Sequence, residues 1–370
     1  MKVEARSENE EHKMKKPFLL ISGILTVVLF TGFVDASAQN DNDAILKVKI
    51  NNVKWWAYNI QHVDTVRQLD ELVGTHFDMY VLEPVVTEKG KASFNIAKLV
   101  REIKAYNKSN YNKEPLVLAY IDIGQAEDWR WYWEENWGIG NPEWIVATDP
   151  NKWEGNYPVA YWYPEWQNIV IYGYKRRSHV EEILKAGFDG IYMDWVEAFS
   201  DEDVIAKADS DGIKTAGAMF DFIAEIRKYA RIQSQHANPN FLIVAQNASD
   251  LHQKNPTRYE NLMDAIALEA VWYDGDGGFD HWADPRGYNI LTNSIYPGWT
   301  GEVLSHLKAI KGKMPIFIAE YAQNLSGKNY ALKVYNELAP QHGFIPYCTR
   351  RSLDRISKTP HPKGYDPIDY

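Results

Sequence analysis

Eight apolar, β-rich runs recur along the chain, and segments with the periodicity of amphipathic helices lie between them. The runs span residues 54–60, 77–84, 115–124, 188–195, 240–247, 263–270, 314–321 and 344–350. Near-continuous apolar strands that alternate with helices are typical of a parallel sheet covered by helices. Eight such units predict a closed (β/α)8 TIM barrel of the α/β class rather than an open sheet. A Rossmann fold is not favoured, because no run is followed by a GxGxxG turn.

Two of the intervening segments have a clear apolar face. In residues 95–109 this face consists of Ile96, Leu99, Val100 and Ile103. In residues 214–235 it consists of Met219, Phe220, Ile223, Ile226 and Ile232. We therefore expect one barrel domain over residues 50–357, after a short N-terminal segment (39–49) and before a C-terminal tail (358–370).

The N-terminus has the three parts of a secretory signal peptide. Two lysines precede an apolar stretch at 17–34, which ends shortly before an Ala-Ser-Ala sequence. We predict a signal peptide over residues 1–38 with cleavage after Ala38, whether translation starts at Met1 or Met14. The protein would then be secreted, periplasmic or held at the cell surface, with no stable membrane span left. An uncleaved membrane anchor is the alternative, because the apolar stretch approaches the length that crosses a bilayer.

The composition narrows the range of partners. The formal net charge of −10 argues against binding to nucleic acid or to an anionic membrane. The single cysteine, Cys348, excludes an intrachain disulfide. The histidines form no HExxH motif or close ligand pair, so we expect neither a metal nor a cofactor. The acidic, glycine-rich stretch 274–280 lacks the full spacing of a calcium-binding EF-hand and favours a turn-rich loop. We expect a monomer.

The connection after the third run is too long for an ordinary barrel loop. It spans residues 125–165 and carries seven tryptophans, namely Trp129, Trp131, Trp133, Trp137, Trp144, Trp153 and Trp162. Long insertions after barrel strands usually build the active-site face. Because indole rings stack on the apolar faces of sugars, this aromatic insertion favours a saccharide-binding cleft.

Polar residues end most of the predicted strands. Catalytic groups of such barrels sit at the C-terminal ends of strands. The corresponding positions here are Glu83, Asp122, Asp194, Asn247, Glu269 and Glu320. Each acid taken alone is more simply explained as a salt bridge or a cap. Five acids on eight strand ends, beside an aromatic insertion, favour a functional site.

The alternation of side chains along a strand selects two of these acids. Asp194 shares its strand face with Gly190 and Tyr192, and Glu269 shares its face with two alanines. The face with smaller members suits the crowded interior of a barrel. The pattern therefore predicts that Asp194 and Glu269 converge at the barrel mouth, where Asp122 could join them.

Two carboxyl groups that flank a sugar are the minimum equipment for cleaving a glycosidic bond. One must be protonated to assist the leaving oxygen, and the other must be ionised to attack carbon or activate water. Mutual repulsion and unequal burial can separate their pKa values in this way. Glu197, three residues after Asp194, could be a second catalytic acid, but a carboxylate at the start of a helix is the favoured interpretation.

At these residues the chain resembles the TM1410/MJ1477-type family of glycoside hydrolases, which is related to the endo-α-1,4-polygalactosaminidases. The matching segments are residues 120–133, 155–170, 187–199 and 266–273, and the resemblance covers nearly all of residues 50–350. It implies a secreted or surface-exposed (β/α)8 barrel that acts on polymers rich in galactosamine or related amino sugars. It also implies that Asp194 is the nucleophile or charge stabiliser and that Glu269 is the acid/base.

One segment departs from the pattern of the family. The third run reads YIDIG, where many relatives resemble YLSIG. Asp122 in place of serine adds a carboxyl group near the site. This group could change the substrate preference or the pKa of its neighbours, so the identity of the polymer stays open.

Other residues near the strand ends are candidate substrate ligands. They are Tyr58, Glu83, Asp122, Glu127, Trp129, Asn247, Trp272, Tyr273, Tyr321 and Arg350. Structural alternatives stay open for several of them. An ion pair between Glu127 and Arg130 could pin the insertion, and Asn247 could orient its own loop. Trp272 and Tyr273 could form a packed loop base.

The sequence thus predicts an endo-acting glycoside hydrolase whose partner is an amino-sugar (galactosamine-type) polysaccharide. A non-catalytic polysaccharide-binding barrel is the main alternative, since a fold does not fix a function. A deacetylase is a weaker interpretation, because the metal ligands that such an enzyme needs are missing from the sequence.

Overall fold

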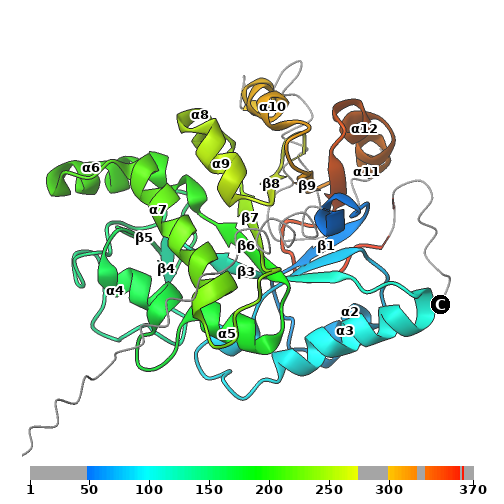
Figure 1. Cartoon of the computed structure of the whole chain (residues 1–370), viewed down its shortest axis with the longest axis horizontal. Helices are drawn as coiled ribbons and strands as arrows, with labels where there is room; N and C mark the ends of the chain where they lie inside the picture. The colour runs from blue at the N-terminus through cyan, green and yellow to red at the C-terminus, as the bar shows by residue number, and fades with distance from the viewer. Residues whose placement is uncertain (1–47, 274–298, 323–329, 359–360, 362–370) are drawn as a thin grey trace, which may run out of the picture.

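A sheet of eight parallel strands forms the centre of the computed structural model, which describes residues 48–273, 299–322, 330–358 and 361 (Figure 1). The strands follow one another in chain order around the sheet. They are β1 (Trp56–Asn59), β2 (Met79–Leu82), β3 (Leu116–Asp122), β6 (Gly190–Asp194), β7 (Leu242–Gln246), β8 (Ala265–Glu269), β9 (Ile316–Glu320) and β10 (Ile345–Cys348). Each of the eight predicted runs contains one strand, which confirms the prediction of a TIM barrel.

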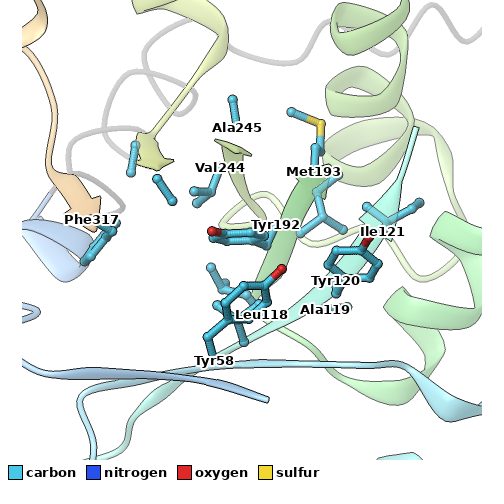
Figure 2. Packing of buried hydrophobic residues seen from close by; sticks show 14 of the residues in the cluster. Tyr58, Leu118, Ala119, Tyr120, Ile121, Tyr192, Met193, Val244, Ala245 and Phe317 are labelled. Atoms are coloured by element: carbon cyan, nitrogen blue, oxygen red, sulfur yellow. The ribbon is translucent and has the colours of Figure 1, made fainter. Parts of the chain in front are cut away.

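The first and last strands approach each other and nearly close the barrel. The indole Nε1 of Trp56 in β1 donates a hydrogen bond of 3.0 Å to the carbonyl oxygen of Ile345 in β10. The rings of Trp56 and Tyr347 lie 5.8 Å apart across the same seam. The interior is filled by large side chains, and Tyr58 and Tyr192 meet there with ring centroids 5.0 Å apart (Figure 2).

Helices cover the outside of the sheet (Figure 1). The α-helices are α2 (Val66–Val73), α3 (Ile96–Tyr111), α4 (Pro164–Gln167), α5 (His179–Ala186), α6 (Glu202–Asp211), α7 (Thr215–Lys228), α8 (Ser249–Lys254), α9 (Pro256–Leu262), α10 (Trp299–Ile310), α11 (Tyr330–Lys333) and α12 (Ala339–His342). Short 3₁₀ turns occur at η1 (Val85–Thr87) and η3 (Val196–Ser200), and π turns at η2 (Asn168–Tyr172), η4 (Tyr229–Gln233) and η6 (Val334–Leu338).

The amphipathic pattern predicts the buried face of α3 fully and that of α7 in part. All four apolar residues predicted for the face of α3 are buried. Along α7 the predicted residues up to Ile226 are buried, but Ile232 is exposed. The predicted assignment of Ile232 to this face is wrong, because nine residues separate it from Ile223, which is about two and a half turns of an α-helix and places it on the opposite side.

At the N-terminal end of the barrel, an aspartate directly precedes the first residue of three strands, β2, β6 and β8. We call Asp78, Asp189 and Asp264 the strand-start aspartates. They accept backbone N–H groups near the start of the preceding strand in the sheet, from Lys54 and Trp55, from Val117 and from Ile243, at 2.7–3.1 Å. Each also forms an ion pair with a basic side chain, from Lys113, Lys104 and Arg231, respectively. These contacts fix the register of neighbouring strands.

The insertion after β3 folds around its own aromatic residues. It contains the antiparallel pair β4 (Gln125–Glu127) and β5 (Asn156–Pro158). Rings pack in a chain in which Trp137 lies 5.6 Å from Trp133 and 5.1 Å from Trp144. Of the seven tryptophans, only Trp129 and Trp153 are exposed. Most of the aromatic density of the insertion therefore serves packing.

Several predictions concern residues outside the described part of the chain. They are the signal peptide (1–38), the acidic loop 274–280 and most of the C-terminal tail (358–370). Within the described ranges, no helix has the length and apolar character needed to cross a membrane.

Candidate active site

Three carboxyl groups end three strands of the barrel at its C-terminal mouth. Asp122, Asp194 and Glu269 are the last residues of β3, β6 and β8. Asp122 pairs with Asp194 in the register of the two neighbouring strands. Because all eight strands are parallel, their C-terminal ends meet at one end of the barrel. The structure thus brings these sequence-predicted acids together.

Hydrogen bonds on both carboxyl oxygens hold Glu269 in place. The Tyr321 hydroxyl donates to Oε1, and the Gln246 amide donates to Oε2. The backbone N–H of Glu269 donates to Oδ1 of Asn247 at 3.0 Å. The hydroxyl of Tyr58 in turn donates to Oε1 of Gln246 at 3.4 Å. Tyr58, Asn247 and Tyr321 therefore surround this acid, as neighbours that orient it.

Asp194 accepts one hydrogen bond on each oxygen. The Tyr120 hydroxyl donates to Oδ2 at 2.6 Å, and the backbone N–H of Trp195 donates to Oδ1 at 2.8 Å. Tyr192 leaves the same strand on the interior side, and its neighbour Met193 points the other way (Figure 2). The side chains of Asp194 and Glu269 both remain partly accessible to solvent, so a ligand can reach them.

The environment raises the pKa values of both Asp194 and Glu269. Burial, together with the negative charge of Asp194, raises the pKa of Glu269 to about 7. Burial also raises the pKa of Asp194, but the donors from Tyr120 and Trp195 stabilise its ionised form and limit the rise. The negative charge of Asp194 adds to the rise in the pKa of Glu269, and the hydrogen bonds to Asp194 favour its ionised form.

The backbone bends in the same unusual way after three adjacent strands. Trp195, Asn247 and Ala270 directly follow the ends of β6, β7 and β8, and their φ angles are 53°, 60° and 50°. A positive φ is uncommon outside glycine, and strained backbone of this kind is found preferentially at functional sites. The three bends turn the chain sharply where it leaves the acids.

Asp122 is more enclosed than the other two acids. Its Oδ1 accepts the backbone N–H groups of Gly124 and Gln125 at 3.0 and 2.7 Å, and its Oδ2 has no hydrogen-bond partner among the described residues. Burial raises the pKa of Asp122 well above its ordinary value, and the charges of Asp194 and Glu127 raise it further. Asp122 therefore caps the turn after β3, and the charge of Asp194 helps to keep it protonated.

Glu83 and Glu127 lie in a buried ion pair with Arg130. The guanidinium of Arg130 donates to Oε2 of Glu127 at 2.5 Å and to Oε2 of Glu83 at 3.1 Å. All three residues are at most 6% exposed. This geometry favours the interpretation in which the ion pair pins the insertion, because neither carboxylate faces solvent.

Four further candidates lie on the loops around the mouth. Trp272 and Tyr273 are buried, and the carboxylate of Glu320 accepts the backbone N–H groups of both, at distances down to 2.7 Å. They form a packed loop base. Arg350 is half-buried and donates to Ser357 at 3.4 Å. Trp129 is 39% exposed on the insertion.

The structure places further residues beside the candidate acids that the sequence does not predict as site residues. Gln246, rather than Asn247, ends β7, and an error of one residue in the strand end hides it. Tyr120 and Tyr192 lie on the inner face of their strands, so alternation could have found them. Glu197 sits in the first turn of η3, as predicted, yet burial raises its pKa well above the ordinary value, and the nearby charges of Asp194 and Glu269 raise it further.

No three His, Cys, Asp or Glu side chains gather in a way that could hold a metal ion within the described ranges. The acids at the mouth instead have hydroxyl, amide and backbone groups as partners. Such a site can donate a proton and stabilise a positive charge on a bound molecule.

Comparisons with known proteins agree with this chemistry. The sequence model of the Glycoside-hydrolase family GH114 matches residues 46–363. The uncharacterized protein MJ1477 of Methanocaldococcus jannaschii is 34% identical over 371 residues, which cover 93% of this chain and 95% of that protein. An uncharacterized protein of Thermotoga maritima is 29% identical over 81% of each chain.

Two solved structures share the fold. The glycoside hydrolase domain of PelA from Pseudomonas aeruginosa superimposes with a TM-score of 0.53 at 16% identity, over 82% of this chain and 97% of that one. Aspergillus fumigatus Ega3, in complex with galactosamine, gives a TM-score of 0.53 at 14% identity, over 82% and 95%. The match of the family model over most of the chain decides the assignment, and the protein belongs to glycoside hydrolase family GH114.

Proposed function

We propose that the protein is a secreted, endo-acting glycoside hydrolase that cleaves an amino-sugar polysaccharide of the galactosamine type. The observation that carries this proposal is the pair of strand-end acids, Asp194 and Glu269, which lie at one mouth, where the charge of Asp194 helps to raise the pKa of Glu269 to about 7. Membership of a glycosidase family supports the reaction class. The galactosamine bound to Ega3 supports the choice of sugar.

Glu269 acts as the general acid in this proposal. Its pKa of about 7 leaves it protonated in mildly acidic solution, so it can give its proton to the glycosidic oxygen as the C–O bond breaks. Tyr321 and Gln246 each occupy one lone pair of the carboxyl group and fix its plane. After the leaving group departs, the ionised Glu269 accepts a proton from the attacking water.

Asp194 acts on the other side of the breaking bond. As a carboxylate it stabilises the positive charge that develops at the anomeric carbon, or it bonds to that carbon as a nucleophile. The hydroxyl of Tyr120 keeps it ionised and oriented. The two roles need opposite protonation states, and the environments of the two acids supply them.

The direct test is a screen of galactosamine- and glucosamine-containing polymers with analysis of the products. The wild type should release short oligosaccharides from a galactosamine polymer, and Glu269→Gln should lose nearly all turnover while it still binds the polymer. Glu225→Gln, which changes a surface carboxylate paired with Lys228, is the matched control. Hydrolysis of none of the polymers, or equal hydrolysis by wild type and Glu269→Gln, would contradict the proposal.

The same variants decide between this proposal and a non-catalytic polysaccharide-binding protein. A binding protein would release no products, and the neutral variants Asp194→Asn and Glu269→Gln would retain all of its measured function. Export is tested separately. Sequencing the N-terminus of the protein recovered outside the cytoplasm should show that the chain begins after Ala38.

A further inference from the structure

The insertion presents an aromatic and acidic patch at one tip. We call Asp128, Trp129, Trp153 and Glu154 the rim patch. Trp129 and Trp153 are 39% and 56% exposed, whereas the other tryptophans of the insertion are packed to a greater degree. Asp128 and Glu154 are exposed as well. Exposing an indole ring to water is unfavourable in free energy, and apolar side chains that are exposed together often mark a binding site.

The two indoles are held by neighbouring turns. The backbone N–H of Asp128 donates to the carbonyl oxygen of Gly155 at 2.9 Å, and the N–H of Asn156 donates to that of Trp153 at 3.3 Å. A Cβ atom at position 155 would lie only 3.0 Å from Cζ3 of Trp129, so the ring covers this glycine. Gly155 also has a φ of +88°, which other residues rarely adopt. The turn that carries Trp153 therefore lies against the turn that carries Trp129.

Buried residues next to the rim patch interact electrostatically with Asp194 at the mouth of the barrel. Glu127, which immediately precedes the patch, ends β4 and lies close enough to Asp194 for their charges to interact. The N–H of Trp153 donates to Oδ1 of Asp149 at 3.0 Å, and the charge of Asp149 also reaches Asp194. The residues that support the tip on both sides, Glu127 and Asp149, therefore lie within electrostatic reach of the candidate catalytic acid.

The charges of the patch suit a particular class of sugar. Burial raises the pKa of Asp128, the negative charge of Glu154 raises it further, and Lys89 offsets only part of this. An indole offers an apolar face to the C–H groups of a sugar ring, and a nearby carboxylate offers a partner to an ammonium group. Neutral sugars would use only the first of these features.

We propose that the rim patch is a distal binding site for amino-sugar units of the polymer, beyond the bond that is cleaved. This inference rests on the proposed function, because it takes the same polymer as the ligand. Trp129 and Trp153 stack on successive sugar rings, and Asp128 and Glu154 bind their ammonium groups. An extended chain then gains affinity from contacts that a short substrate cannot reach.

Binding by length tests this inference without any turnover. Galactosamine disaccharide and octasaccharide are titrated calorimetrically into Glu269→Gln and into the same variant carrying Trp129→Ala and Trp153→Ala. The dissociation constant for the octasaccharide should rise by about tenfold or more, while that for the disaccharide should stay unchanged. Trp153→Phe should retain most of the affinity, because an aromatic face remains.

The control is Tyr172→Ala, which removes an exposed aromatic ring near the opposite end of the barrel, where Tyr172 contacts Tyr229. It should leave both dissociation constants unchanged. Equal losses for the two oligosaccharides, or no loss for either, would overturn the distal site. If wild type depolymerises the substrate but its length dependence survives the tryptophan changes, only this inference fails. If neither oligosaccharide binds at all, both this inference and the proposed function fail.

Discussion

The strand-start aspartates and the four acids around the candidate site have opposite kinds of partners. At the N-terminal end, each strand-start aspartate has both backbone N–H donors and a basic partner, such as Arg231 at 2.8 Å from Asp264. At the mouth, Asp122, Asp194, Glu197 and Glu269 form no ion pair with any residue in the described ranges. The first arrangement stabilises the fold, and the second leaves negative charge available to a ligand.

This contrast separates stability from function within one molecule. A buried carboxylate that is paired with a basic side chain and backbone N–H groups stabilises the folded state. Its hydrogen-bonding capacity is already used, so it cannot bind a substrate. A carboxyl group that lacks a cation costs stability and gains a raised pKa, which acid catalysis requires. Variants at the two ends should therefore differ in which property they change.

The largest expected effect is on turnover at the mouth. In the proposed mechanism Asp194→Asn removes the carboxylate that stabilises positive charge at the sugar, so kcat on the galactosamine polymer should fall by about a thousandfold or more. The amide can still accept the hydrogen bond from Tyr120, so the melting temperature should change little. Release of reducing ends and thermal unfolding, measured on the same preparation, check both parts. Substantial residual turnover would remove Asp194 from the reaction.

The next effect is on stability at the opposite end. Asp264→Asn leaves the buried guanidinium of Arg231 without its anionic partner, so the free energy of unfolding should fall by about 3–5 kcal/mol. Activity per folded molecule should stay at the level of wild type. Denaturant titration measures the change, and Asp221→Asn, in an exposed pair with Arg258, is the control with a loss of about 0–1 kcal/mol.

A reversal of these roles would break the comparison. If Asp264→Asn lowered turnover of the folded protein while its stability stayed the same, the N-terminal end would not be merely structural. The same conclusion would follow if the exposed control lost as much stability as the buried variant.

A smaller effect concerns the dependence of stability on pH. The folded state raises the pKa of Glu269 from an ordinary value of 4.5 to about 7. The folded protein therefore binds more protons than the unfolded chain between these values, and it loses stability as the pH rises through them. Glu269→Gln lacks this loss, so it should match wild type near pH 4 and exceed its stability at pH 8, by about 1–3 kcal/mol.

Urea titrations at both pH values measure how far the stability of Glu269→Gln differs from that of wild type, and how this difference changes with pH. A variant that is less stable than wild type at pH 8 would show that the carboxylate at this position is stabilised rather than strained. A similar gain at both pH values would point to packing instead of charge.

The sequence predicts the barrel and the direction of its strand-end acids because both depend on short-range periodicity. Apolar runs and period-two alternation locate Asp194 and Glu269 at the mouth, and the amphipathic pattern locates the buried face of α3. These features need only residues a few positions apart. They stay visible in one sequence for that reason.

Contacts between distant segments were not predictable in the same way. Whether Glu83 faces a ligand or an ion pair depends on Arg130, which lies 47 positions away. Which tryptophans of the insertion face solvent depends on how the insertion packs, so the sequence does not predict their exposure. Gln246 was missed because the end of β7 was placed one residue too late.

The most direct test of the central claim is the pH dependence of kcat/KM on a galactosamine polymer, measured for wild type and Tyr321→Phe. Wild type should lose activity as the pH rises, with a falling limb near pH 7, because Glu269 must hold a proton. Removing the Tyr321 hydroxyl takes away a donor that stabilises the ionised Glu269, so the limb should move to higher pH. A profile that stays flat into the alkaline range, or a limb that does not move in Tyr321→Phe, would contradict the assignment of Glu269 as the acid.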